Sequence, residues 1–245
     1  MNEAAAAGEE ALARGAGGAM LYDASCLHHP DTAVFERSHG QAHGTLETTP
    51  GGRGTVAFVR TRDGQRWVLR HYRRGGFIAR LVADRYLWTG AEQTRSFREW
   101  RLLRQLRAWE LPVPQPVATR YVRVGLFYRA DLLTAELPVR QTLTQALQSG
   151  PLPADTWRAI GACIGALHAR GVQHADLNAH NLLLGAGHAV YVLDFDRGRL
   201  RERGAWEHAV LERLQRSLRK VTAELPADRF GEPQWQALLA GVPGH

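Results

Sequence analysis

Three side chains able to hold a metal ion or a proton occur close together in the stretch from His174 to Asp196. Asp176 and Asn181 lie five residues apart in a polar segment, and Asp194 follows thirteen residues later, at the end of an apolar run. Two carboxylates and a carboxamide oxygen form a hard, oxygen-rich set of ligands that suits Mg²⁺. Mg²⁺ held by a few protein oxygens, with room for water and phosphate, is typical of phosphoryl-transfer sites.

Two short apolar segments are expected to bring these side chains together. Residues 182–184 and 189–193 are predicted to form strands, and Gly185-Ala186-Gly187-His188 between them is a turn of conformationally permissive residues. Because the two strands of a hairpin run side by side, the loop before the first strand lies next to the residue after the second. The sequence therefore predicts that the two carboxylates and the carboxamide converge on one site.

The composition is that of a globular protein with a basic, arginine-rich surface. The formal net charge is +7, Lys220 is the only lysine, and residues 53–129 contain seventeen arginines against five acidic residues. Such a field favours anionic partners, namely phosphates, carboxylates, nucleic acid or an anionic membrane surface. The two cysteines, Cys26 and Cys163, have no metal-ligand spacing and indicate a reducing compartment.

Two features in the first half of the chain are candidates for binding phosphate. Gly52, Arg53 and Gly54 form a glycine-rich turn before a predicted strand, and glycine lets backbone N–H groups approach phosphate oxygens. A second strand, residues 67–72, contains Arg70. Because the only lysine lies near the other end of the chain, Arg70 is the best-placed residue to neutralise nucleotide phosphates. The alternatives are an ordinary turn and an ordinary surface arginine.

A helix predicted over residues 94–109 supplies a partner for Arg70. Its apolar residues recur at helical spacing: Phe97, Trp100, Leu103 and Leu106. Glu99 lies in the first half of this helix, where packing against the strands would direct its carboxylate at Arg70. The alternative is a helical surface charge that is paired within the helix.

Two further helices are predicted in the second half of the chain. One begins at Asp155 or Thr156, runs to Arg170 and ends before Gly171, with an apolar stripe that indicates core packing. The other covers residues 205–221 and is amphipathic, with a strongly basic polar face. Such a helix could rest on anionic lipid, but a core helix with a solvated face is the favoured interpretation.

The order His-x-Asp-x-x-x-x-Asn followed by Asp-Phe resembles the catalytic and metal loops of protein-kinase-like phosphotransferases. The wider set resembles one family closely, the bacterial 3-deoxy-D-manno-octulosonic acid (Kdo) kinases among the lipopolysaccharide core kinases. The residues that carry this resemblance are Gly52-Arg53-Gly54, Leu69-Arg70-His71-Tyr72-Arg73-Arg74-Gly75-Gly76, Asp84-Arg85-Tyr86, Ser96-Phe97-Arg98-Glu99, His174 to Asn181, and Asp194-Phe195-Asp196-Arg197-Gly198.

This resemblance implies a phosphotransferase that uses ATP and Mg²⁺. Asp176 is expected to accept or orient the proton of the acceptor hydroxyl, and Arg70, oriented by Glu99, to neutralise phosphate charge while the glycine-rich turn covers the phosphates. Asn181 and Asp194 are expected to hold Mg²⁺. Asp196 replaces the glycine that usually follows Asp-Phe, and it is a further candidate metal ligand.

The implied fold is α+β and protein-kinase-like, with two lobes. Residues 1–20 are expected to form a flexible tail, residues 21–137 a small β-rich lobe with one main helix, and residues 138–245 a mostly helical lobe. The implied acceptor is the Kdo residue, at its 4-OH, of Kdo–lipid A. The implied location is the cytoplasmic face of the bacterial inner membrane, in peripheral contact with anionic lipid, without a signal peptide or a transmembrane helix.

Several departures from the protein-kinase pattern bear on the substrate. Ala175 replaces the arginine of the catalytic loop, Asn178 stands where a lysine often contacts phosphate, and no Ala-Pro-Glu anchor follows. These differences argue against a protein substrate. A kinase-like enzyme that acts on another small molecule, such as an antibiotic, and a non-catalytic kinase-like binding module remain as alternatives. Nucleic acid is not expected as a partner, because the sequence has no nucleic-acid-binding motif.

Overall fold

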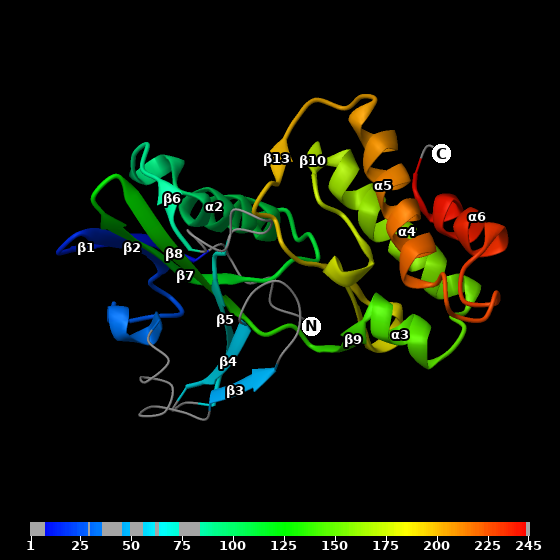
Figure 1. Cartoon of the computed structure of the whole chain (residues 1–245), viewed down its shortest axis with the longest axis horizontal. Coiled ribbons are helices and arrows are strands. Elements are labelled where there is room, and N and C mark those ends of the chain that lie inside the picture. Colours follow the sequence, from blue (N-terminus) through cyan, green and yellow to red (C-terminus); the bar gives the residue numbers. More distant parts are fainter. Residues whose placement is uncertain are drawn as a thin grey trace. The chain divides into compact units, whose positions relative to one another are not determined.

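The computed structural model describes residues 8–28, 30–35, 46–49, 56–61, 64–73 and 84–243. The chain divides into two compact units (Figure 1). Unit 1 contains the described residues up to Ala108 together with Pro114–Glu136, and unit 2 contains Trp109–Val113 and the chain from Leu137 onward. The division after Glu136 lies one residue from the lobe boundary expected from the sequence, although the short segment before Pro114 belongs to unit 2.

Unit 1 is built on one antiparallel sheet whose path runs β1-β2-β7-β8-β5-β4-β3, with β6 paired to β8. Among the described residues of this unit, the 3-10 helix η1 (Thr32–Phe35) follows β2, and the 3-10 helix η3 (Ala91–Gln93) lies between β6 and the main helix. The strands are β1 (Glu10–Gly15), β2 (Gly18–Asp23), β3 (Leu46–Thr49), β4 (Val56–Arg60), β5 (Arg66–His71), β6 (Tyr86–Leu87), β7 (Pro116–Val124) and β8 (Phe127–Ala135).

The first two strands correct the predicted N-terminal tail. The segment before residue 20 was expected to be flexible, but β1 pairs with β2 as a hairpin, and β2 in turn pairs with β7 in the sheet. Gly17 has a φ of 79° in the turn, a left-handed conformation that glycine adopts without strain. Met20 and Leu21 are buried, so this hairpin contributes apolar side chains to the core of unit 1. The high alanine and glycine content of the segment concealed this pattern.

Helix α2 (Arg95–Ala108) is the main helix of unit 1 and packs against β7 and β8. The apolar stripe predicted from its spacing is buried almost completely. Glu99 lies on the buried side of the same helix, with its side chain only 2% exposed. The interpretation of Glu99 as a surface charge is therefore wrong, because the helix directs this carboxylate into the protein.

Unit 2 is mostly helical, with two small antiparallel sheets, β10-β13 and β12-β11-β9, and two 3-10 helices, η4 (Ala179–Asn181) and η5 (Ala186–His188). Its helices are α3 (Leu143–Ser149), α4 (Ala154–Ala169), α5 (Trp206–Val221) and α6 (Glu232–Gly241). Its strands are β9 (Val139–Thr142), β10 (Val172–Gln173), β11 (Leu182–Gly185), β12 (Val190–Val192) and β13 (Arg199–Leu200).

Helix α4 delivers the chain into the segment that carries Asp176. Its predicted apolar stripe is buried, and Gly161 lies so close to α6 that a Cβ atom there would overlap the Leu238 carbonyl oxygen. The predicted N-cap at Asp155 or Thr156 is wrong, because the N-cap position is Pro153 and no side chain caps the helix. Gly171 follows the helix with a φ of 68°, as expected of a residue that ends a helix in the left-handed conformation.

The buried thiol and the amphipathic helix of unit 2 both belong to its core. Burial raises the pKa of Cys163 to about 12, so this cysteine behaves as a small apolar side chain. In α5 the apolar residues Val210, Leu211, Leu214 and Leu218 are buried, whereas the basic residues of the helix are exposed. The favoured interpretation of a core helix with a solvated face is confirmed, and the apolar stripe of α5 is covered by protein.

Candidate active site

The predicted hairpin is present in unit 2, and it connects the polar segment to Asp194. Strands β11 and β12 pair in register from Leu182 with Val192 to Leu184 with Val190. The pairing continues beyond the strands, because the Leu193 N–H donates to the Asn181 carbonyl at 2.9 Å. Asn181 therefore lies opposite the residue that precedes Asp194.

Two side-chain amides hold the backbone of Asp176. Asn178 Nδ2 donates to the Asp176 carbonyl at 2.8 Å, and Asn181 Nδ2 donates to the same oxygen at 3.2 Å. The Asn178 oxygen accepts from the His180 N–H at 2.9 Å, which fixes the turn. Because the Asn181 amide nitrogen points to the Asp176 carbonyl, its carboxamide oxygen is directed elsewhere and can serve as a metal ligand.

His174 links the segment of Asp176 to the segment of Asp194. The imidazole is buried, and its Nε2 donates to the Leu193 carbonyl at 2.8 Å. The ring also lies against Phe195, with the two ring centroids 4.8 Å apart. These contacts on either side of Asp194 explain why a histidine precedes the candidate base, since it fixes the second segment against the first.

Asp194 and Asp196 supply carboxylates after β12. Asp194 has a φ of 67°, a left-handed conformation that aspartate adopts more readily than most residues, and it is exposed. Among the described residues, no group of three or more histidine, cysteine, aspartate or glutamate side chains could hold a metal. A site for Mg²⁺ would thus use the Asn181 carboxamide with one or two of these carboxylates and would complete its coordination with water and phosphate, which is the usual case for Mg²⁺.

Two arginines contact Asp176, and the sequence predicted a role for neither. Arg213 Nη2 donates to Asp176 Oδ1 at 2.5 Å, and Arg197 Nη1 lies 3.8 Å from Oδ2. Arg213 belongs to α5, 37 residues from Asp176, so no local spacing could have indicated this contact. All three side chains are partly exposed, which leaves the carboxylate accessible to an acceptor.

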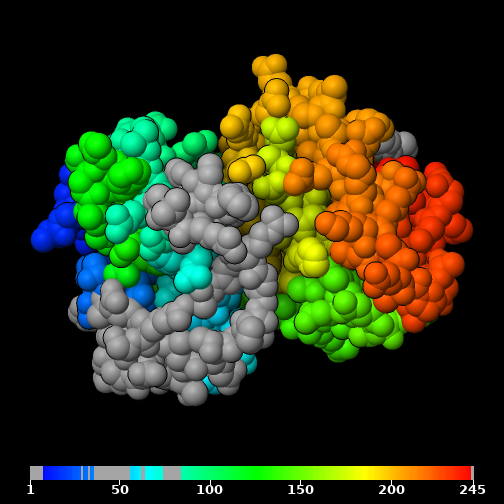
Figure 2. Space-filling model, in the orientation of Figure 1, coloured from blue at the N-terminus to red at the C-terminus, as the bar shows by residue number. Residues whose placement is uncertain are grey.

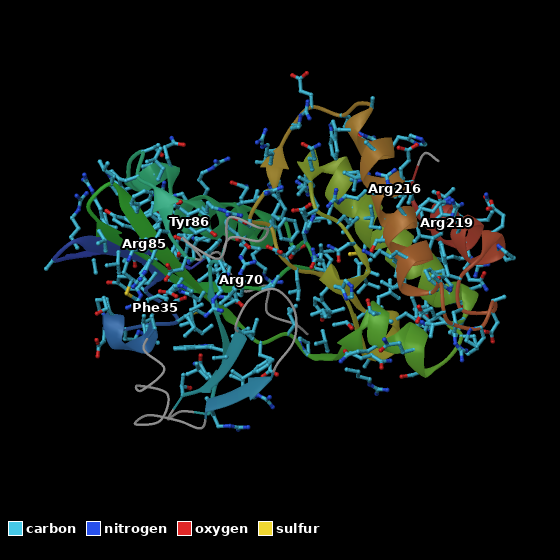
Figure 3. All side chains as sticks on the ribbon, viewed as in Figure 1. Phe35, Arg70, Arg85, Tyr86, Arg216 and Arg219 are labelled. Carbon is cyan, nitrogen blue, oxygen red and sulfur yellow. The ribbon has the colours of Figure 1, made fainter. Side chains whose placement is uncertain are left out.

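The predicted pair in unit 1 is also present. Arg70 on β5, labelled in Figure 3, forms an ion pair with Glu99 on α2. Tyr72 joins them, because its hydroxyl donates to Glu99 Oε2 at 2.5 Å and accepts from Arg70 Nη2 at 3.3 Å. Burial raises the pKa of the Tyr72 phenol well above its usual range, and the neighbouring Glu99 carboxylate raises it further. The phenol therefore stays protonated and holds the carboxylate that orients Arg70.

The remaining candidates for phosphate binding, Gly52, Arg53 and Gly54, lie outside the described residues. Of the other candidates, Arg70 and Glu99 belong to unit 1 and form a direct contact. Asp176 and Asn181 in unit 2 are joined by a hydrogen bond, and the backbone pairing of β11 and β12 brings Asn181 beside the segment that contains the two further carboxylates.

The sequence matches the profile of the "Lipopolysaccharide kinase (Kdo/WaaP) family" over residues 39–241. A 3-deoxy-D-manno-octulosonic acid kinase of Vibrio parahaemolyticus is 40% identical over 82% of this chain and 84% of that protein. Proteins with the same name from Xylella fastidiosa and Xanthomonas axonopodis pv. citri are 42% and 45% identical, over 86% and 83% of this chain and 84% and 81% of those proteins.

Among solved structures, an amicoumacin kinase in complex with AMP-PNP and Ca²⁺ has a similar fold. The TM-score is 0.58 over 80% of this chain and 71% of that chain, and the sequences are 11% identical. Such a low identity shows the fold alone. The α+β, protein-kinase-like fold predicted from the sequence is therefore confirmed.

Proposed function

The chain belongs to the lipopolysaccharide kinase (Kdo/WaaP) family of phosphotransferases, and we propose that it transfers the terminal phosphate of ATP to the 4-OH of Kdo in Kdo–lipid A. The supporting observation is the set formed by Asp176, Asn181 and the segment around Asp194, which are linked by the Asn181 amide and by the Leu193–Asn181 backbone hydrogen bond. Because the family is one of lipopolysaccharide kinases, we assign phosphoryl transfer to this set.

Catalysis by this chain depends on positioning and on electrostatics. Asp176 accepts the proton of the acceptor hydroxyl as the oxygen attacks the terminal phosphorus of ATP, whose bond to the bridging oxygen breaks and releases ADP. Arg70, held by Glu99 and Tyr72, binds phosphate oxygens of the nucleotide. Asn181 and Asp194 would hold Mg²⁺, with Asp196 as a further carboxylate. When bound, the metal ion neutralises charge that develops on the phosphates.

The acceptor class is tested with purified protein, Mg²⁺ and ATP labelled at the terminal phosphate. We expect label to appear in Kdo–lipid A, but neither in lipid A that lacks Kdo nor in an aminoglycoside. The positive charge around Asp176 supports this preference. An arginine-rich protein with two guanidinium groups at its candidate base suits an anionic acceptor and repels a cationic one. Transfer to the aminoglycoside alone would show that the chain is an antibiotic kinase.

The proposed substrate is a glycolipid, so the enzyme would act at a membrane surface. No described helix is long and apolar enough to cross a bilayer. We infer that the protein contacts the cytoplasmic face of the inner membrane peripherally, and that a protein substrate and nucleic acid are not among its partners. The apolar stripe of α5 does not supply this contact, since its residues are buried.

A further inference from the structure

We propose that Arg213 and Arg197 form an anion-binding site beside Asp176 that takes the carboxylate of the acceptor sugar. This inference rests on the proposed function and names the residues that would recognise the acceptor. Two positive groups face one carboxylate there, because the Arg213 guanidinium contacts Oδ1 of Asp176 and the Arg197 guanidinium lies 3.8 Å from Oδ2. Each guanidinium has five N–H donors in a planar fork, so donors remain for a second anion.

Helix α5 places Arg213 at this position. Ser217 lies one turn further along the helix and accepts a hydrogen bond at 3.2 Å from the Ala179 N–H, in the segment that carries Asp176. Residues four apart share a helix face, so α5 presents Arg213 and Ser217 together to this segment. The buried Leu214 and Leu218 anchor the helix in unit 2.

The acceptor carboxylate is the anion whose position fits best. A general base must reach the hydroxyl that it deprotonates, so side chains that touch Asp176 border the acceptor. Kdo is a sugar acid, and its carboxylate belongs to the same monosaccharide as the reacting hydroxyl. A guanidinium group pairs with a carboxylate in a bidentate geometry that a lysine cannot reproduce.

The variant Arg213→Gln tests this site. Loss of a charge-assisted hydrogen bond predicts a rise of roughly 10- to 100-fold in KM for Kdo–lipid A, with little change in KM for ATP. Arg216→Gln is the matched control, because it removes the same charge from the exposed face of α5 (Figure 3) and should leave both constants near those of the wild type. Thermal unfolding of both variants checks that the helix is intact.

A chemical change in the acceptor separates a carboxylate from a phosphate as the bound anion. Methyl esterification of the Kdo carboxylate should weaken the wild-type enzyme about as much as Arg213→Gln does, and it should cause little further loss in that variant. A rise in KM for ATP instead would assign Arg213 to the nucleotide. An unchanged KM for the acceptor would overturn the inference. Failure of the wild type to phosphorylate Kdo–lipid A would contradict the proposed function itself.

A different observation, in unit 1, carries a second inference: we propose that one end of the sheet binds an anionic membrane surface. This sheet-end patch consists of apolar side chains that are 37% to 71% exposed: Leu87, Val122, Val124, Leu126 and Phe127. Val124 pairs with Phe127, and Phe127 pairs with Leu87, so these three side chains share one face of the sheet with Val122, two residues before Val124. Leu126 lies in the turn between β7 and β8, at the edge of this face. Figure 2 shows the β7–β8 hairpin, in green, at the surface of unit 1.

Exposed arginines around the sheet-end patch favour anionic lipid as the occupant. Arg129 shares the face of the patch and pairs with Asp84 at 2.8 Å, and Arg123 lies on the opposite face, over the Trp88 ring at 5.1 Å. Arg85 precedes β6 and is also exposed (Figure 3). Basic side chains beside apolar ones suit a bilayer interface, where headgroups attract the arginines and acyl chains accept the apolar side chains. Contiguous exposed apolar patches mark interaction surfaces, membrane-binding surfaces among them, and the arginines around this patch favour the membrane.

Sedimentation of the whole protein with vesicles tests this surface without any measurement of activity. We expect binding to vesicles that contain phosphatidylglycerol and weaker binding to vesicles of phosphatidylcholine alone. The double variant Leu126→Gln/Phe127→Gln should bind at least about tenfold more weakly, because two apolar side chains no longer enter the lipid. Leu12→Gln is the matched control, since Leu12 is 46% exposed on β1, away from the patch. Wild-type binding by the double variant would overturn the inference, as would the absence of vesicle binding by the wild type.

Discussion

Asp176→Asn is expected to reduce kcat by about 10²- to 10⁴-fold, the range associated with loss of a general base. The carboxamide has the same shape as the carboxylate but cannot accept the hydroxyl proton. The fold should survive, because Asn178 and Asn181 hold the backbone carbonyl at this position and not its side chain. Steady-state kinetics with Kdo–lipid A and ATP measure the change, and KM for ATP should stay near its wild-type value.

Asp155→Asn is the control for this variant. Asp155 is an exposed aspartate that also pairs with an arginine, Arg158, in the first turn of α4. Because surface pairs contribute about 0–1 kcal/mol to stability, both variants should unfold near the wild-type temperature. If Asp176→Asn kept kcat within about tenfold of the wild type, below the range expected for a general base, Asp176 would not be the base.

Arg70→Ala is expected to lose both stability and nucleotide binding. The change leaves the buried Glu99 carboxylate without its arginine, and removal of one partner of a buried pair costs on the order of 3 kcal/mol. Urea denaturation measures this loss. On the same strand, Arg66→Ala breaks the exposed pair with Glu136 and should cost about 1 kcal/mol or less.

The double variant Arg70→Ala/Glu99→Gln separates the structural role of the pair from its role in catalysis. A neutral amide can still accept the Tyr72 hydrogen bond, so most of the lost stability should return. Nucleotide binding should not return, because no guanidinium then faces the phosphates, and KM for ATP should stay raised at least about tenfold. Recovery of a wild-type KM for ATP in the double variant would show that Arg70 acts only through the fold.

The elements around Asp176 could be predicted from the sequence because their signals are local. The glycine-containing turn between two apolar runs determines the β11–β12 hairpin, and the hairpin determines that Asn181 lies opposite Leu193. The pair of Arg70 and Glu99 spans 29 residues, but few acids in the first half of the chain lie on a predicted helix. Excluding the acidic residues that lie outside the predicted helix was therefore enough to identify Glu99 as the partner of Arg70.

Contacts that depend on tertiary packing could not be predicted. Arg213 reaches Asp176 only because the buried stripe of α5 orients the helix, and nothing in the spacing of residues along the chain reveals that orientation. The β1–β2 hairpin was missed for another reason. Its alanine and glycine residues resemble those of a flexible tail, and its pairing with β7 determines its structure. Tyr72 belongs to the family motif, but its role in holding Glu99 follows from a hydrogen bond to α2 that only the tertiary structure shows.

Mass spectrometry of the reaction product tests the central claim most directly. The purified protein is incubated with Mg²⁺, ATP and Kdo–lipid A, and the product is then cleaved to separate Kdo from lipid A. We predict one added phosphate group, located on the Kdo fragment and reduced by at least about a hundredfold at equal reaction time when Asp176→Asn replaces the wild type. An unmodified acceptor, or a phosphate located on the lipid A fragment, would contradict the assignment of this chain as a kinase that acts on Kdo.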